Sequence, residues 1–343
     1  MFHPSRCTTF LCCWVALLAL GGSACRSNAE ADAPDTASIS THQAAVEAKS
    51  PATVPAADGS PTVRPPIRPP HQPPVVEEVV FHHRTLPQGT ARREQSRTTM
   101  QMNMVVKAHD EVLKKGQTTR ENIEHKQVTI LATDTLGQVT QAKVVYTELV
   151  EIRTEGEQSP QRRANPLSGK TYIATLADGA MTIKDAQGAD VPSGEADEVI
   201  AGNGDLLQPN TLHKLIPQGA IAVGTKLPIE KALLAQLFEL DEPGALEIEE
   251  AWMILREVRE IQGQRAGVFE TELTLSAVID KLKMSFDLSG QLSVALANGH
   301  LVELTLDGPV RFTTPQDPQQ PNWVELEGHG SITMHKQLRA VQP

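Results

Sequence analysis

The sequence predicts a mainly β protein of the α+β class, with one or two curved antiparallel sheets, as in a half-barrel, and a short helical insert. Long stretches alternate apolar and polar residues with a period of two, which is typical of half-buried strands. Turn sequences such as Ala297-Asn298-Gly299-His300 separate these stretches, and Asn-Gly between alternating runs is a strong hairpin signal. Clear helical patterns occur only in the middle of the domain, at about 194–240.

The first half of the predicted domain, about 77–190, contains alternating runs that are joined by turns. Asp134-Thr135-Leu136-Gly137 and Asp178-Gly179 have the composition of such turns. The predicted strands of this half are Thr98–Val106, Thr119–Leu131, Val139–Ile152, Lys170–Leu176 and Met181–Lys184.

The insert at 194–240 is predicted to contain three helical segments. The first runs from Ser193 to Ile200, with Ser193 as its possible cap, and a short second one covers Asn210–Ile216. The strongest helical pattern is Pro228–Leu240, because proline suits the first turn of a helix. Its apolar face consists of Ile229, Leu233, Leu237 and Leu240.

Residues 246–260 fit a strand and a helix almost equally well. Leu246, Ile248 and Trp252 belong to an alternating pattern, but Trp252 and Leu255 also fall at helical spacing. A strand is favoured because Gln262-Gly263-Gln264 predicts a hairpin turn into a strand over Val268–Leu275.

The second half of the domain, about 246–338, ends in the most regular alternation of the chain. Gly290 and Gly308 lie inside the two longest runs and are expected to permit bends. A last strand is predicted over Trp323–Met334. Both halves consist of strands around hairpins, which suggests a duplication, although no residue-by-residue alignment supports it. The shared faces of the two long runs are Met284, Phe286, Leu288, Leu292, Val294 and Leu296 in one, and Val302, Leu304, Leu306, Val310 and Phe312 in the other.

The first 76 residues are expected to lie outside this domain. Residues 1–24 have the features of an export signal: Arg6, an apolar run over Phe10–Leu20, and small residues before Cys25. A retained N-terminal anchor helix and an ordinary signal peptide cut near Ala24 are the alternatives. Residues 25–76 are rich in Ala and then in Pro, which predicts a disordered spacer or a proline-rich recognition segment.

The end of the signal segment, Ser23-Ala24-Cys25, resembles the lipobox of bacterial lipoproteins, although Gly22 stands where that family usually has leucine. The resemblance implies cleavage between Ala24 and Cys25, and acylation of Cys25 on its sulfur and its new amino terminus. Several acyl chains make stable membrane anchoring possible. In enteric bacteria an aspartate after the cysteine favours inner-membrane retention. Arg26 therefore points to the outer membrane of a bacterial cell envelope.

The predicted domain, 77–343, loosely resembles uncharacterised β-rich bacterial lipoproteins and lipoprotein carriers built as open half-barrels, over about residues 77–340. No single motif carries this second resemblance. It implies a curved sheet covered by helices.

Composition and motifs exclude several classes of function. A net charge of −11 and 3% aromatic residues do not suit a nucleic-acid partner. Ser168-Gly169-Lys170-Thr171 imitates a phosphate loop, but Ala164 replaces the required glycine. No cysteine follows Cys25, and neither His82-His83 nor His329 with His335 has the spacing of a metal site. No enzymatic activity, cofactor or metal is therefore expected.

The expected function is a non-enzymatic binding module for a hydrophobic ligand or an envelope partner. The candidate ligand surface is an apolar face of the sheet, consisting of Met100, Met102, Met104, Phe286 and Leu304. A purely structural envelope protein, in which the same face is filled core, is the first alternative. An envelope enzyme without a recognisable motif is the second.

Overall fold

The computed structural model describes most of the chain from residue 77 to residue 341. The described ranges are 77–108, 111–177, 179–203, 206, 212–231, 233–234, 246–279, 282–314 and 324–341. The predicted signal segment (1–24), Cys25 and the predicted linker (25–76) lie outside the described residues.

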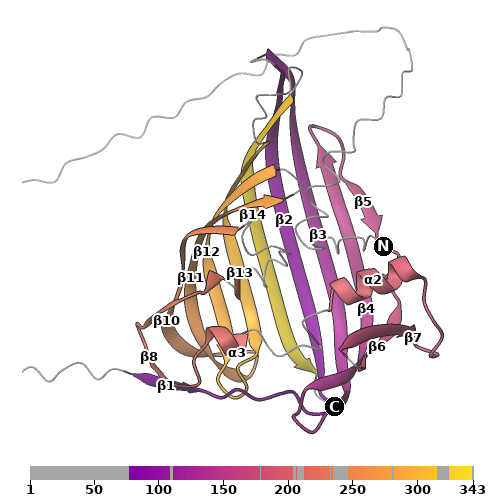
Figure 1. The fold of residues 1–343 in the computed structure, drawn as a ribbon, viewed down its shortest axis with the longest axis vertical. Coiled ribbons are helices and arrows are strands. Elements are labelled where there is room, and N and C mark those ends of the chain that lie inside the picture. Colours follow the sequence, from indigo (N-terminus) through magenta and orange to yellow (C-terminus); the bar gives the residue numbers. More distant parts are fainter. Residues whose placement is uncertain are drawn as a thin grey trace, which may run out of the picture. The chain divides into compact units, whose positions relative to one another are not determined.

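One antiparallel sheet of 12 strands forms most of the described structure, and the sheet does not close on itself (Figure 1). Along the sheet the strand order is β7-β6-β4-β3-β2-β14-β13-β12-β11-β10-β9, and β5 pairs with β4. The first half of the sheet contains β2 (Ala91–Ala108), β3 (Glu111–Thr133), β4 (Val139–Glu155), β5 (Gln161–Ala164), β6 (Thr171–Ala177) and β7 (Ala180–Asp185). The second half contains β9 (Lys226–Pro228), β10 (Leu246–Ile261), β11 (Gln264–Ile279), β12 (Leu282–Ala295), β13 (Leu301–Thr313) and β14 (Val324–Val341).

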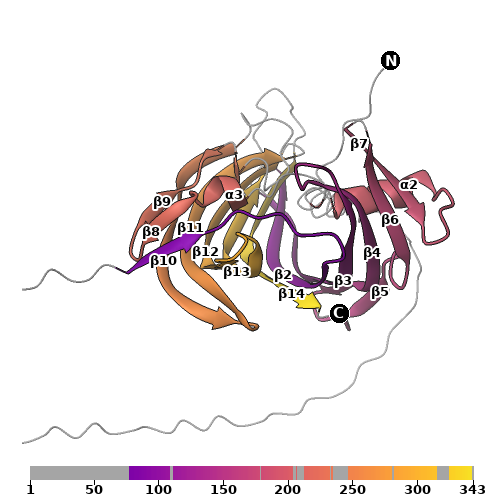
Figure 2. The same ribbon diagram turned by 90° about the horizontal axis from the view of Figure 1, so that it is seen from below.

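The mainly β prediction is confirmed, and the two predicted halves join in one main sheet. The halves meet where β14 pairs with β2 along their whole lengths, from Val324 opposite Ala108 to Val341 opposite Ala91. Residues 246–260 form strand β10, as favoured from the hairpin turn that follows them. Figure 2 shows the sheet bending through β10–β13, so that it is curved and not flat.

A second, two-stranded sheet pairs β1 (Glu78–Phe81) with β8 (Gly219–Ala222). Phe81 and Ile221 are buried in the same hydrophobic core as the strands of the second half. The sequence did not predict either strand, because four residues give too little alternation to recognise.

Two helices lie in the described part of the insert. Helix α2 (Ser193–Ala201) packs on the first half of the sheet, where Val199 is buried with Tyr146 and Tyr172. The prediction that Ser193 caps this helix is wrong: Ser193 is its first residue, and Pro192 holds the cap position without a side-chain hydrogen bond. Helix α3 (Leu212–Leu215) lies within the predicted segment Asn210–Ile216. Neither helix has the length and apolar character needed to cross a bilayer.

The predicted helix Pro228–Leu240 is only partly described. Pro228 ends strand β9, where it lies opposite Trp252 of β10. A helical turn follows, in which the backbone N–H groups of Leu233 and Leu234 both donate to the carbonyl of Glu230. Residues 235–240, including Leu237 and Leu240, lie outside the described residues.

The predicted apolar face of β13 is interrupted near its start. The pairing of β12 with β13 shifts by one residue, from Ser293 opposite Glu303 to Val294 opposite Leu301. Such a bulge reverses which residues share a face. Leu304 and Leu306 therefore belong to the main core, whereas Val302 packs in a small separate cluster with Ala266 and Ala295.

Candidate functional site

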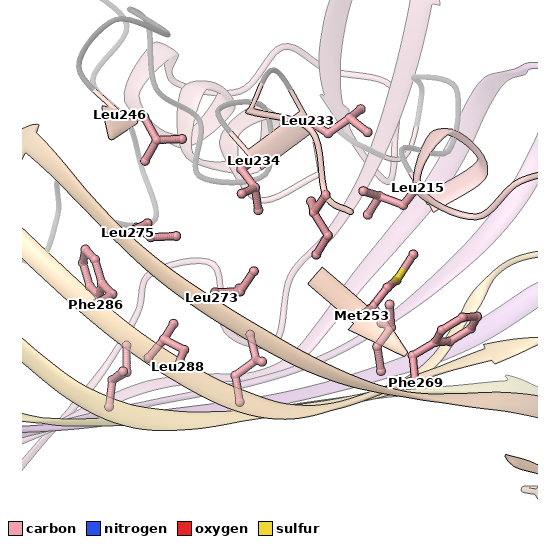
Figure 3. Close-up of a cluster of buried hydrophobic side chains, with 14 of the residues drawn as sticks. Leu215, Leu233, Leu234, Leu246, Met253, Phe269, Leu273, Leu275, Phe286 and Leu288 are labelled. Atoms are coloured by element: carbon pink, nitrogen blue, oxygen red, sulfur yellow. The ribbon is translucent and has the colours of Figure 1, made fainter. Parts of the chain in front are cut away.

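The main hydrophobic core lies between the curved second half of the sheet and the segments that cover it (Figure 3). Leu215, Leu233 and Leu234 come from the covering segments and lie opposite side chains of the sheet. The facing side chains that Figure 3 labels on the strands are Met253, Phe269, Leu273, Leu275, Phe286 and Leu288. Leucine and phenylalanine at these positions remove a large apolar area from water, which stabilises the curved arrangement.

This core is not completely filled, because a cavity of about 580 Å³ lies beside it. Half of the residues that line it are leucines, most of them from β11, β12, β13 and β14 and from the covering segments. Its volume falls within the range of roughly 300–1,000 Å³ that is typical of small-molecule sites. The leucines of the wall are Leu86, Leu136, Leu206, Leu212, Leu215, Leu234, Leu273, Leu288, Leu292, Leu301, Leu304, Leu306 and Leu338.

Two cationic side chains, Arg92 of β2 and Lys336 of β14, reach the wall of this cavity. The buried carboxylate of Glu94 lies 2.7 Å from Arg92 Nη2 and 3.9 Å from Lys336 Nζ. Burial alone would raise the pKa of Glu94, but the charges of Arg92, Lys126 and Lys336 outweigh it and hold the pKa at about 2. Glu94 is therefore ionised at neutral pH.

Lys126 connects this charged cluster to helix α2. Its Nζ lies 2.9 Å from Glu124 and 3.7 Å from Glu94, and it donates a 2.8 Å hydrogen bond to the carbonyl of Gly202 at the end of α2. Lysine near the carboxyl end of a helix also interacts favourably with the helix dipole. The charged cluster is thus attached to helix α2 as well as to the sheet.

Three histidines that are distant in sequence lie together, and two of them, His213 and His300, line the cavity. The rings of His83 and His213 stack at 4.4 Å with an interplanar angle of 3°, and the ring of His300 lies 5.6 Å from that of His213. His213 Nε2 lies 3.0 Å from the carbonyl oxygen of Asn298, and His300 Nε2 lies 2.9 Å from that of Arg84. These contacts attach the segment after β1 and helix α3 to the β12–β13 hairpin.

Comparison with protein-family models and with curated protein sequences finds no match to this chain. A structure of lipovitellin, described for its lipid–protein interactions, aligns with a TM-score of 0.32 and 8% identity, over 75% of this chain and 26% of the lipovitellin chain. A LolA-superfamily protein from Nitrosomonas europaea aligns with a TM-score of 0.13 and 10% identity, over 76% of this chain and 89% of the other. A receptor binding domain aligns with a TM-score of 0.15 and 8% identity, over 73% and 82% of the two chains. All three similarities are weak.

The five residues of the predicted ligand surface have different places in the structure. Leu304 is half-buried and lines the cavity. Met100, Met102 and Phe286 are buried in the main core, and Met104 packs against that core, but none of these four lines the cavity. The predicted lipidation and cleavage site, Ala24 and Cys25, lies outside the described residues.

The histidine cluster is not arranged as a metal site in the part of the chain that the structure describes. Within the described ranges, no three side chains of the His, Cys, Asp or Glu type are arranged to hold a metal ion. Burial lowers the pKa of His213, and the backbone hydrogen bond to Asn298 opposes this only in part. Burial likewise lowers the pKa of His300, to about 4, and the charge of Arg92 adds to the effect. Both rings are therefore neutral at pH 7.

Acidification from pH 6.5 to about pH 4 is expected to destabilise the protein through His300. A histidine whose pKa is lower in the folded than in the unfolded protein binds its proton preferentially when unfolded. The penalty is absent above pH 6.5 and grows as the pH falls toward 4. The thermal unfolding midpoint, followed by circular dichroism across this range, should therefore fall less steeply in His300→Gln than in the wild type. An equally steep fall in both proteins would contradict this role of His300.

Proposed function

We propose that the protein is a lipid-anchored binding protein of the bacterial cell envelope, and that its cavity takes up a hydrophobic ligand. The observation that carries the proposal is the cavity of about 580 Å³ with its leucine-rich wall. No catalytic step forms part of this proposal.

The chemistry of the cavity wall favours an apolar ligand. Leucine side chains offer dispersion contacts and no hydrogen bonds, so an alkyl chain gains about 0.8 kcal/mol for each methylene group that it buries there. A structural protein with a filled core would have no use for such a space, because core residues normally pack without voids larger than a water molecule. Met100, Met102 and Phe286 of the neighbouring core are buried and do not line the cavity.

The anchoring part of the proposal rests on the sequence around Cys25. Lipidation of Cys25 would hold the domain at a membrane, and Arg26 favours the outer membrane over the inner one. The Ala- and Pro-rich residues 26–76 would then act as the spacer between the acyl chains and the binding domain. The cavity and the lipid anchor are independent parts of the proposal, so an experiment can contradict one part and leave the other standing.

Mass spectrometry of the protein extracted from bacterial membranes tests both parts. The intact protein is expected to begin at Cys25 and to carry added acyl mass. Under native conditions a further non-covalent adduct, soluble in organic solvent and present at one copy per chain, is expected from the cavity. An unmodified N-terminus would contradict the anchor, and a protein that neither retains nor takes up any alkyl compound would contradict the binding function.

A further inference from the structure

Resting on the function proposed above, we propose that the ligand is a single-chain amphiphile with an anionic head group, which binds Lys336 and Arg92 where β14 meets β2. The apolar chain of the ligand would lie along the leucine wall of β13 and β12. The proposal thus assigns a head-group subsite to the part of the cavity wall that β2 and β14 form.

Both cations carry donor groups that the described part of the protein does not use. Lys336 Nζ is 3.9 Å from the nearest oxygen of Glu94, which is too far for a hydrogen bond, and it has no closer partner among the described residues. Arg92 Nε is buried and donates no hydrogen bond to a described residue, although its Nη2 group pairs with Glu94. The buried Nε of Arg92 costs free energy as long as it has no acceptor, and an anionic head group would supply one. The same head group would be attracted to the ammonium of Lys336, whose side chain is 36% exposed.

The charges of the cluster around Glu94 do not cancel. Three cations, Arg92, Lys126 and Lys336, stand against two carboxylates, Glu94 and Glu124. Lys126 is already close to both carboxylates, at 2.9 Å from Glu124 and 3.7 Å from Glu94. Lys336 is the most weakly paired of the three, so the surplus positive charge lies mainly on Lys336, which lines the cavity together with Arg92.

The other described polar residues of the wall do not offer a competing charge. Thr85, Gln138 and Thr271 are uncharged, and burial keeps His213 and His300 neutral at pH 7. Arg92 and Lys336 are therefore the charged groups of the described cavity wall at neutral pH. An anionic group would therefore be attracted to this part of the wall only, which orients the ligand.

The strand register gives the path of the apolar chain. Lys336 lies directly opposite Leu304 of β13, Leu304 lies opposite Leu292 of β12, and Leu292 lies opposite Phe269 of β11. Directly paired residues share a face of the sheet, and Leu304 and Leu292 both line the cavity. The two strand spacings from Lys336 to Leu292 cover about 10 Å. An alkyl chain that starts at Lys336 thus crosses leucine side chains along its length.

The test compares dodecanoate, dodecyl phosphate and dodecanol as competitors of a neutral fluorescent alkyl probe bound to the full chain. The two anions should bind about tenfold more tightly than the alcohol, as expected for a charge-assisted hydrogen bond. The advantage should shrink at high salt. The tighter of the two anions identifies whether the head group is a carboxylate or a phosphate.

Lys336→Met removes the charge but keeps most of the apolar stem, and it should reduce the affinity for both anions to that for dodecanol. Lys143→Met is the matched control, because Lys143 is exposed on β4 between the buried residues Ala142 and Val144. Equal affinities of the wild type for anions and alcohol, or an anion preference that survives in Lys336→Met, would overturn the head-group subsite. If none of the three compounds binds, the proposed function itself fails.

Discussion

Alanine in place of Gly308 is expected to lower the free energy of unfolding by about 3 kcal/mol, because the added methyl group would overlap a neighbouring strand. A Cβ at this position would lie 1.9 Å from the carbonyl oxygen of Asp287 and 3.0 Å from the Cα of Leu288. These are backbone atoms, so no side-chain rotation can relieve the overlap. Gly290 has the same constraint from the opposite strand, since its Cβ would lie 1.9 Å from the carbonyl oxygen of Thr305.

Urea denaturation of Gly308→Ala and of a control, Gly116→Ala, measures this effect. Gly116 lies inside strand β3, and a Cβ there would meet no atom within 4 Å. Without an overlap, alanine in a strand is more stable than glycine by about 0.5–1 kcal/mol. The two substitutions should therefore change the free energy of unfolding in opposite directions. A similar change in both variants would contradict the close approach of β12 and β13.

The strands could be predicted from the sequence because alternation and turn composition are local properties. The Asn298-Gly299 turn and the alternating runs on either side of it correspond to the β12–β13 hairpin. The predicted turn at 262–264 favoured a strand over 246–260, and this prediction is confirmed. Gly290 and Gly308 were expected to permit bends, and the structure shows that each also allows a neighbouring backbone to approach closely.

Predictions failed where tertiary contacts override a local pattern. Pro228 suits the first turn of a helix, yet it ends strand β9, because Lys226, Leu227 and Pro228 pair with β10. Val302 has the right period for the face that contains Leu304, but the bulge beside it turns Val302 to another cluster. The short strands β1 and β8 form only because they pair with each other across the chain.

Only part of the candidate ligand site could be predicted from the sequence. Leu304 could be identified from its alternating run, whereas Arg92 and Lys336 meet only through the pairing of β2 with β14, which no local pattern reveals. A signal was nevertheless present, since Arg92 and Glu94 are in phase with the buried Met100 and Met102. Charged residues in phase with a buried face are unusual and indicate a buried ion cluster or a binding site. His83, His213 and His300 come from separate segments, so no local pattern in the sequence predicted that they lie together.

Tryptophan in place of Leu304 is expected to abolish ligand binding while the protein stays folded. Leu304 is half-buried and lines the cavity between Lys336 and Leu292, so a larger side chain at this position would occupy the path of the alkyl chain. The loss of affinity should be at least about tenfold, which corresponds to about 1.4 kcal/mol. Because the indole would enter existing space, the free energy of unfolding should change by less than about 1.5 kcal/mol.

The most direct test of the cavity as a ligand site is the titration of a fluorescent alkyl probe into wild-type protein, Leu304→Trp and Val278→Trp. Val278 is 49% exposed on β11, so its replacement adds the same bulk outside the cavity. We predict saturable binding of one probe per chain to the wild type and to Val278→Trp, and none to a folded Leu304→Trp. Equal binding by all three proteins, or no saturable binding by the wild type, would contradict a ligand site in the cavity.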